Sequence, residues 1–300
     1  MRGSRWIVGI AAAACATATV TGSAGARPVA SNPTAAQLTL MATDFPGAVA
    51  AGGAVKDGGA AAPGYERLIV LKAPFGTSHY QEIVSIAYLV DSTPLAARFY
   101  ATEGHFFSSK AGRTALVKEF AKTASLSAGS ATLITPRALG VGDSSMEAGF
   151  VARQAKGSGR VNLSISLVRV DRAVIIDVAI GKSTVVAKQD AVALSQLVVH
   201  HVDAAFEPGA VTPPSIGGST VHGDTLTATT GSWNGAPTAY AYQWNRCDAT
   251  GDACVAIPGA TAPTYVLVSA DVGTTLRVAV TASNHYGSAT STSAASATVG

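Results

Sequence analysis

The chain has 300 residues, of which 48% are hydrophobic and only 13% are charged. This composition excludes a disordered polyelectrolyte and is sufficient for about two folded domains. The net charge is +3 and the Lys and Arg residues are dispersed rather than clustered, which argues against nucleic acid as a partner.

Residues 1–26 have the pattern of an export signal. Arg2 and Arg5 precede the apolar run 7–20, and small residues end the segment at Ala26. The run is shorter than a membrane-spanning helix, and no later segment is apolar enough to span a bilayer. We therefore expect cleavage after Ala26 and a protein that is secreted or held at the cell surface.

Cys15 lies inside the apolar run and raises an alternative, a lipid anchor on an acylated cysteine. The residues before it are AAAA, which lack the large aliphatic side chain usual three places upstream of such a cysteine. Removal of Cys15 with the signal is the favoured outcome.

Residues 27–207 are predicted to form an α+β domain in which helices cover one face of an antiparallel sheet. The patterns first predict a short helix ending at Pro46-Gly47, a flexible loop at 51–64 and strands at 65–74 and 82–92. Two helices follow, one starting at Ser92 and one over 113–124. The domain then ends with strands at 149–155, 161–169 and 173–180 and an amphipathic helix over 184–206.

The strand at 161–169 alternates apolar and polar side chains. Asn162, Ser164 and Ser166 share one face, and apolar residues occupy the other. This pattern predicts a sheet with one buried face and one face exposed to water.

Residues 208–300 are predicted to form an all-β domain after a linker at 207–215 that is rich in Pro and Gly. Short runs of Thr, Ser and Val recur with turn residues between them, which is typical of a sandwich.

Several segments of this domain, among them GDTLTATTGSWNG, AYQWNRCD, ATAPTYVLVSADVGTTLRVAV and ASNHYGS, resemble the immunoglobulin-like repeat domains of secreted bacterial surface proteins. The resemblance covers nearly all of 212–300. It implies a buried Trp244 and an Asp-x-Gly corner at Asp271 and Gly273. No cysteine lies on the TLRVAV strand, so the antibody inter-sheet disulfide is absent. In the first domain, LTLMATDFPG and VGDSS resemble sensor-type extracytoplasmic domains of bacterial envelope proteins.

Cys247 and Cys254 are the cysteines that follow the export signal. A zinc site would need more ligands, and the nearest histidines lie in other segments at spacings that match no motif. A redox pair usually has two residues between its cysteines, whereas six lie between these. In an oxidising compartment we expect a disulfide that closes the DATGDA turn, with metal and redox sites as the alternatives.

Tyr240, Tyr242 and Trp244 alternate and therefore share one face of a strand. Such a row forms either a platform on which sugars stack or part of a core. We expect Trp244 in the core and leave both roles open for the two tyrosines.

His200 and His201, with Asp203 nearby, suggest a metal site. Successive residues of a helix are about 100° apart, so the two imidazoles cannot hold one ion from one face. We expect a surface pair.

Asp143, Ser144 and Ser145 follow two glycines, and a hydrolase would pair one of these serines with His105. No G-x-S-x-G, H-E-x-x-H or paired-carboxylate context accompanies them, and a turn at Asp143 explains the residues without chemistry.

The sequence thus predicts an exported, non-catalytic binding protein without a cofactor or metal, whose partner is a cell-envelope glycan or protein. The ligand-binding residues are not identified by any motif. The alternative is a secreted hydrolase of an envelope polymer, with the immunoglobulin-like module as its anchor. A pocket that brings His105 or another histidine within hydrogen-bond reach of a serine or carboxylate would favour the hydrolase.

Overall fold

The computed structural model describes residues 35–57, 63–124, 126–156 and 158–300. The predicted export signal, including Cys15, lies outside these residues. The chain divides into two compact units, the first ending at Val202 and the second running over Asp203–Gly300.

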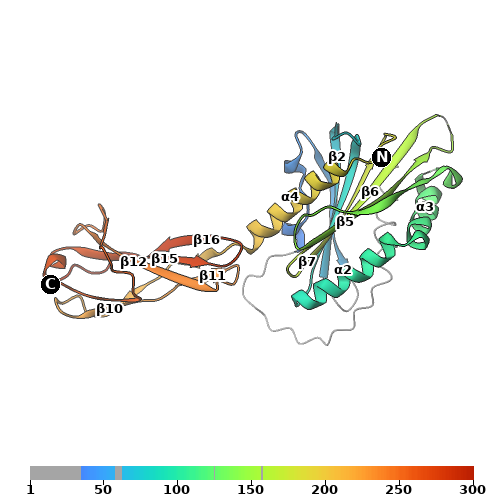
Figure 1. The fold of residues 1–300 in the computed structure, drawn as a ribbon. Coiled ribbons are helices and arrows are strands. Elements are labelled where there is room, and N and C mark those ends of the chain that lie inside the picture. The colour runs from blue at the N-terminus through green and yellow to red at the C-terminus, as the bar shows by residue number, and fades with distance from the viewer. Residues whose placement is uncertain (1–34, 58–62, 125, 157) are drawn as a thin grey trace. The chain divides into compact units, whose positions relative to one another are not determined.

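A seven-stranded antiparallel sheet dominates the first unit (Figure 1). Its strands are β1 (Val49–Asp57), β2 (Pro63–Phe75), β3 (Tyr80–Leu89), β4 (Thr132–Ala138), β5 (Ser144–Arg153), β6 (Arg160–Val170) and β7 (Ala173–Gly181). The order across the sheet is β1-β2-β3-β7-β6-β5-β4, so β7 is central and β1 and β4 are the edges.

Both edge strands differ from the prediction. The expected flexible loop at 51–64 is wrong for the residues that the structure describes, because 51–57 belong to β1 and 63–64 to β2, and these two strands pair; residues 58–62 lie outside the described ranges. Gly and Ala have low strand propensity, so the sequence of β1 shows no strand pattern. β4 was not predicted at all, since Pro136 and a register shift between Ile134 and Arg137 interrupt its alternation. Proline is tolerated there because the strand lies at an edge.

The described part of the chain has three α-helices, α2 (Thr93–Ser108), α3 (Lys110–Ala124) and α4 (Lys188–Phe206). α2 begins as predicted, with Ser92 at its N-cap position and a proline in its first turn. The short helix expected before Pro46 is wrong. The segment instead forms two 3-10 turns, η1 (Ala35–Leu38) and η2 (Ala42–Asp44). Another 3-10 turn, η4 (Ala128–Ser130), precedes β4.

One face of the sheet is apolar and packs against α2 and α3. Phe99 and Phe107 from α2 and Phe120 from α3 join a core with side chains of β2, β3, β5, β6 and β7. Phe120 meets Phe150 edge to face, with ring centroids 5.6 Å apart. Burial of these large apolar side chains is the main term that stabilises the unit.

The opposite face carries polar side chains among apolar ones and is buried, so the predicted exposed face is wrong. Asn162, Ser164 and Ser166 are only 0%, 2% and 2% exposed. In Figure 1 the sheet lies between α4 on one side and α2 with α3 on the other, and Leu194 and Val198 of α4 are buried. Alternation along a strand distinguishes its two faces, but it does not reveal that a distant helix covers the polar one.

The predicted α+β class, with helices on one face of the sheet, is wrong. Strands make up 42% of the residues that the structure describes, and several antiparallel sheets define a largely β fold with only short helices. The error has a physical origin. Helical periodicity is the clearest pattern in a sequence, whereas Gly-rich or Pro-interrupted strands such as β1 and β4 carry almost no period-two pattern.

The second unit contains three small sheets. They are the four-stranded sheet of β13 (Val255–Ala256), β12 (Ala239–Cys247), β15 (Thr275–Ser283) and β16 (Ser288–Thr292), the three-stranded sheet of β14 (Thr264–Val266), β10 (Thr225–Ala228) and β9 (Ile216–Gly217), and the pair of β11 (Ser232–Asn234) with β8 (Gly209–Thr212). β8 lies within the segment predicted as a linker.

Asp271 ends a 3-10 turn, η5 (Ser269–Asp271), directly before β15, and it is fully buried. Its carboxylate accepts hydrogen bonds from Arg246 Nε at 2.7 Å, Val268 N at 2.7 Å and the Tyr265 hydroxyl at 3.0 Å. Gly273 follows with a φ of 79°, a conformation that favours glycine. The corner implied by the resemblance is thus a buried, fully hydrogen-bonded turn.

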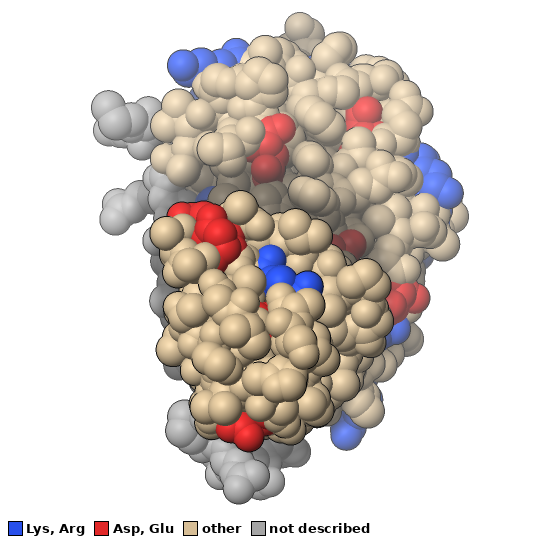
Figure 2. Space-filling model, turned by 90° about the vertical axis from the view of Figure 1, so that its left-hand side faces the viewer, with Lys and Arg blue, Asp and Glu red and all other residues tan. Residues whose placement is uncertain are grey.

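Charged side chains are sparse on the face of the molecule shown in Figure 2. Lys, Arg, Asp and Glu appear there scattered among a majority of uncharged residues.

Candidate functional site

A small pocket lies at the end of the seven-stranded sheet where β3 begins and β7 ends. Its volume is about 160 Å³. This sheet-end pocket is lined by Gln81, Glu82, Gln154, Val161, Ile180, Gly181 and Lys182.

The pairing of β3 with β7 brings the two charged residues of the pocket to the same sheet end. Glu82 pairs with Ile180, and Lys182 follows β7 after Gly181. A register shift between Tyr80 and Glu82 introduces an irregularity at Gln81. Such a shift re-aims side chains, so that Gln81 and Glu82, although adjacent in sequence, both line the pocket.

The pocket has an apolar floor. Val161 at the start of β6 and Ile180 at the end of β7 belong to the core under α2 and α3, and each is only 7% exposed. Gly181 also lines the pocket. A Cβ at this position would lie 2.5 Å from Asn162 Oδ1 and 2.6 Å from the carbonyl oxygens of Ser78 and His79, so only glycine fits there.

The electrostatics of the pocket centre on Glu82. Burial raises the pKa of its carboxyl, and the positive charge of Lys182 lowers it in part. Glu82 Oε2 is buried and accepts no hydrogen bond from the described residues. The pocket therefore offers a carboxyl acceptor without a partner, an exposed ammonium group and two side-chain amides.

A satisfied polar network lies on the sheet face toward α4. Arg137 Nε donates to Glu147 at 2.6 Å, and Ser164 Oγ donates to the same carboxylate at 2.7 Å. Arg137 Nη2 also donates to the Val186 carbonyl at 2.9 Å, which fixes the segment before α4. We assign this network a structural role, since each charge is paired.

Asp177 lies on the same face, near the middle of the central strand β7. It is 1% exposed and stands between Ser85 on β3 and Ser166 on β6. The Ser85 hydroxyl accepts a hydrogen bond from Leu40 N at 3.1 Å, and neither oxygen of Asp177 has a partner among the described residues. Burial raises the pKa of Asp177 to about 7. The Ser85 hydroxyl beside it on β3 makes no hydrogen bond of normal geometry to the carboxyl group and lowers this pKa only in part.

Glu103 is a second buried carboxyl, on the opposite side of the sheet. It lies on the buried face of α2 between Phe99 and Phe107, and it is 0% exposed. Both of its oxygens lack a hydrogen-bond partner in the described structure, and burial raises its pKa to about 7.

Cys247 and Cys254 form the predicted disulfide. The bond closes the turn between β12 and β13, within which Asp248 accepts hydrogen bonds from Thr250 N at 3.0 Å and Asp252 N at 2.9 Å. The Thr250 hydroxyl also donates to Asp248, at 2.6 Å, and contributes most to lowering the pKa of this carboxyl, with the backbone bonds adding to the effect. The cysteines act as a staple.

Replacing both cysteines with alanine is expected to lower the free energy of unfolding of the second unit by about 2 kcal/mol, because the open turn gains conformational freedom when unfolded. Thermal melts with and without a reducing agent measure the effect. The reduced wild type should melt like Cys247→Ala/Cys254→Ala, and the variant should not respond to the reductant. A wild type that is insensitive to full reduction would contradict the assigned role.

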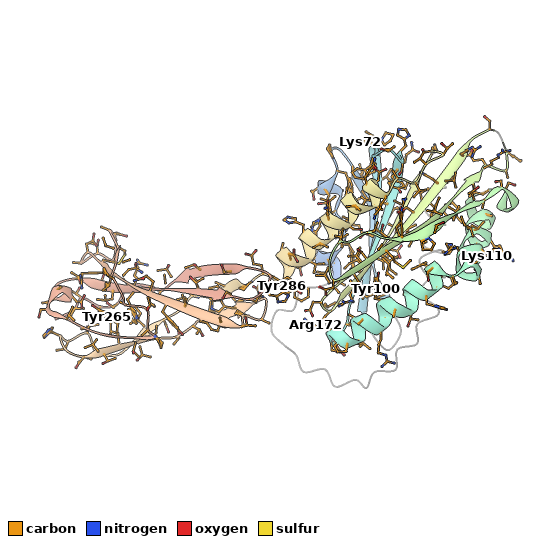
Figure 3. All side chains as sticks on the ribbon, viewed as in Figure 1. Lys72, Tyr100, Lys110, Arg172, Tyr265 and Tyr286 are labelled. Carbon is orange, nitrogen blue, oxygen red and sulfur yellow. A yellow bond between two sulfur atoms is a disulfide. The ribbon has the colours of Figure 1, made fainter. Side chains whose placement is uncertain are left out.

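The aromatic row of β12 is mainly part of the core. Trp244 is 0% exposed, donates its indole N–H to the Ala262 carbonyl at 3.0 Å and stacks on Tyr265, labelled in Figure 3, with ring centroids 5.7 Å apart. Tyr242 packs against this core, and Tyr240 is 40% exposed. A stacking platform could use Tyr240 only.

The two adjacent histidines of α4 differ in their surroundings. His200 is exposed, whereas His201 Nε2 lies 3.0 Å from both carboxylate oxygens of Asp44. His201 therefore links α4 to η2. Within the described ranges, no group of three or more His, Cys, Asp or Glu side chains is arranged to hold a metal ion.

The serines proposed for a hydrolase have structural partners. Ser144 donates to the Asp143 carbonyl at 2.7 Å, and the Ser145 hydroxyl accepts from Val141 N at 2.9 Å. The Asp143 carboxylate accepts from Asp171 N at 2.7 Å and from Arg169 at 3.1 Å. These bonds close the turns around β5.

His105 lines a shallow apolar depression on α2 and α3 together with Ser109. The Ser109 hydroxyl donates to the Phe106 carbonyl at 3.0 Å and accepts from Gly112 N at 2.9 Å, so backbone groups occupy it. No hydrogen bond joins it to His105 in the described structure. No hydrogen bond joins His105 to Ser144 or Ser145 in the described structure either, so the serine–histidine pair of the hydrolase alternative is not formed there.

A histidine and a serine side chain are in contact elsewhere in the described structure. His222 Nε2 lies 3.1 Å from Ser269 Oγ, and both residues are exposed. This pair lines neither the sheet-end pocket nor the depressions on α2 and α3.

Sequence reasoning missed every residue of the sheet-end pocket. One cue was present, because Glu82 has the same parity along β3 as Val84, Ile86 and Tyr88, which face the core. A charged residue at an inward position of a strand is unusual and marks a candidate site.

Neither a family model nor a curated protein matches this chain. The resemblances to immunoglobulin-like repeats and to envelope sensor domains therefore rest on the quoted segments alone. Among the described residues, no helix combines the length and apolarity needed to cross a membrane.

Proposed function

We propose that this chain is an exported, non-catalytic binding protein of the bacterial cell envelope. Its first unit binds a small polar group of an envelope glycan or protein in the sheet-end pocket. Its second unit is an immunoglobulin-like module that positions the first or adds adhesion.

The observation that carries this proposal is the unpartnered carboxyl oxygen of Glu82 within a pocket. A buried acceptor without a hydrogen bond costs about 1–3 kcal/mol, and a ligand that donates to it recovers that free energy. An apolar floor with a few convergent polar groups is the usual composition of a binding site. The pocket is lined by a single carboxyl group, that of Glu82, and by no serine, cysteine or histidine. It therefore has neither the paired carboxylates of a glycosidase nor a Ser or Cys nucleophile beside a base, which favours binding over hydrolysis.

Export is supported by two features of the sequence. The N-terminal pattern is that of a signal peptide. The disulfide belongs to an oxidising compartment, since cytosolic thiols are kept reduced.

Gly159→Ala tests the pocket without changing a charge. A Cβ at position 159 would lie 2.4 Å from Oε1 of the pocket residue Gln154, so the amide must move. Gly129→Ala is the matched control, because nothing lies within 4 Å of the Cβ it would add. The full-length protein is sedimented with purified insoluble cell-wall material, and bound protein is measured in the pellet.

We expect wild type and Gly129→Ala to be retained equally and Gly159→Ala to be retained several-fold less. Gln154→Ala should repeat the loss if Gly159→Ala folds poorly, as judged by circular dichroism. No retention of the wild type at any pH or salt concentration, or equal retention of all variants, would overturn the proposal.

A further inference from the structure

We infer that the sheet-end pocket recognises a small zwitterion, a group that carries an amino and a carboxyl function on one carbon. This inference rests on the proposed function and specifies the ligand of the same site. Four properties of the pocket lead to it.

The first property is the acceptor at the pocket wall. Glu82 Oε2 is buried without a donor, and the strongest donor to a carboxylate is a cation. A ligand ammonium group would supply both a hydrogen bond and the charge that the buried carboxylate lacks. A neutral hydroxyl would supply only the weaker bond.

The second property is the positive charge that shares the pocket. Lys182 lies close enough to lower the pKa of Glu82, yet it leaves Oε2 without a hydrogen bond. A ligand with an amine alone would meet repulsion from Lys182, and a ligand with a carboxylate alone would meet repulsion from Glu82. A zwitterion matches both charges, and the amides of Gln81 and Gln154 remain for its carboxylate oxygens.

The third property is size. The pocket has a volume of about 160 Å³, which is enough for a molecule as small as glycine or alanine.

The fourth property is the floor. Val161 and Ile180 present aliphatic side chains at the bottom of the pocket. They favour a hydrogen or a methyl group over a hydroxyl at the ligand carbon, because a buried hydroxyl there would have no partner. Alanine, as either enantiomer, is therefore the preferred probe.

Calorimetric titration of the full-length protein at pH 7.5 tests the inference with glycine, L-alanine, D-alanine, ethylamine, propionate and glucose. We expect an amino acid to bind and the singly charged and neutral compounds to bind at least tenfold more weakly. Glu82→Gln and Lys182→Met should each weaken binding by tenfold or more. Glu119→Gln and Lys110→Met, whose parent residues lie on α3 outside the pocket (Figure 3 labels Lys110), should not.

The affinity should fall at low pH, because protonation of Glu82 removes the partner of the ammonium group, and burial places this transition above the ordinary pKa of glutamate. Absence of amino-acid binding up to about 10 mM, or equal binding of ethylamine or glucose, would overturn the inference. Cell-wall retention that still depends on Gln154 would then leave the proposed function standing. If retention is also independent of the pocket, both fail.

Discussion

Replacing Asp177 with asparagine is expected to remove a pH-dependent loss of stability of the first unit, which in the wild type amounts to about 4 kcal/mol between pH 4 and pH 8. Asp177 is buried and unpartnered, and its pKa rises from 3.8 in its ordinary state to about 7 in the fold. The unfolded chain therefore releases this proton at a lower pH than the folded chain. Stability falls as the pH rises from about 4 to about 7 and stays constant above that range. Asparagine has no proton to lose and removes this penalty.

The measurement is urea unfolding at pH 5 and pH 8, followed by the helical circular dichroism of α2, α3 and α4. Glu103 adds a similar pH dependence to both proteins, so the difference between them isolates Asp177. Asp190→Asn is the matched control, and we expect it to change the stability of the first unit in the opposite direction. Asp190 is also buried, but it accepts hydrogen bonds from Thr77 N at 3.2 Å and Ser78 N at 2.6 Å, and its neutralisation should destabilise.

A gap between wild type and Asp177→Asn that is the same at pH 5 and pH 8 would show that Asp177 is ionised in the fold at both values. That outcome would require a partner for its carboxylate and would contradict the assignment of an unpaired buried acid.

Replacing Trp244 with alanine is expected to destabilise the second unit by about 3–5 kcal/mol. The indole is fully buried at the centre of a small core that also contains Leu226, Leu276 and Val278, and its N–H has a backbone partner. So small a core cannot fill the resulting cavity by relaxation. The variant should therefore unfold at a much lower denaturant concentration.

Tryptophan emission provides the measurement, because Trp233 remains as a probe within the same unit. Tyr240→Ala is the control, since its exposed ring should contribute less than about 1 kcal/mol. Loss of cell-wall retention by a stable Tyr240→Ala protein would instead identify this exposed ring as part of a stacking platform.

Local patterns in the sequence were sufficient for part of the fold. The serine and proline at 92 and 94 marked the start of α2, and the alternation over 161–180 identified β6 and β7 and their apolar face. The disulfide followed from the compartment and the spacing of its cysteines. Each of these features depends on residues that are close together in the chain.

The features that were missed depend on distant residues or on weak patterns. β1 consists largely of Gly and Ala, and Pro136 breaks β4, so neither strand shows a clear period. The cover over Ser164 and Ser166 comes from α4, which is more than twenty residues away in the chain. The pocket joins Glu82, Gln154 and Lys182 through strand order, which no spacing in the sequence encodes.

The proline in β4 has a consequence for behaviour at high concentration. An edge strand with a complete row of free N–H groups can template the addition of a strand from another molecule, the first step of fibril growth. Pro136 has no N–H to offer, and the register shift beside it bends the rim where an incoming strand would align. The edge strand β4 is therefore protected against strand addition by the proline that it contains.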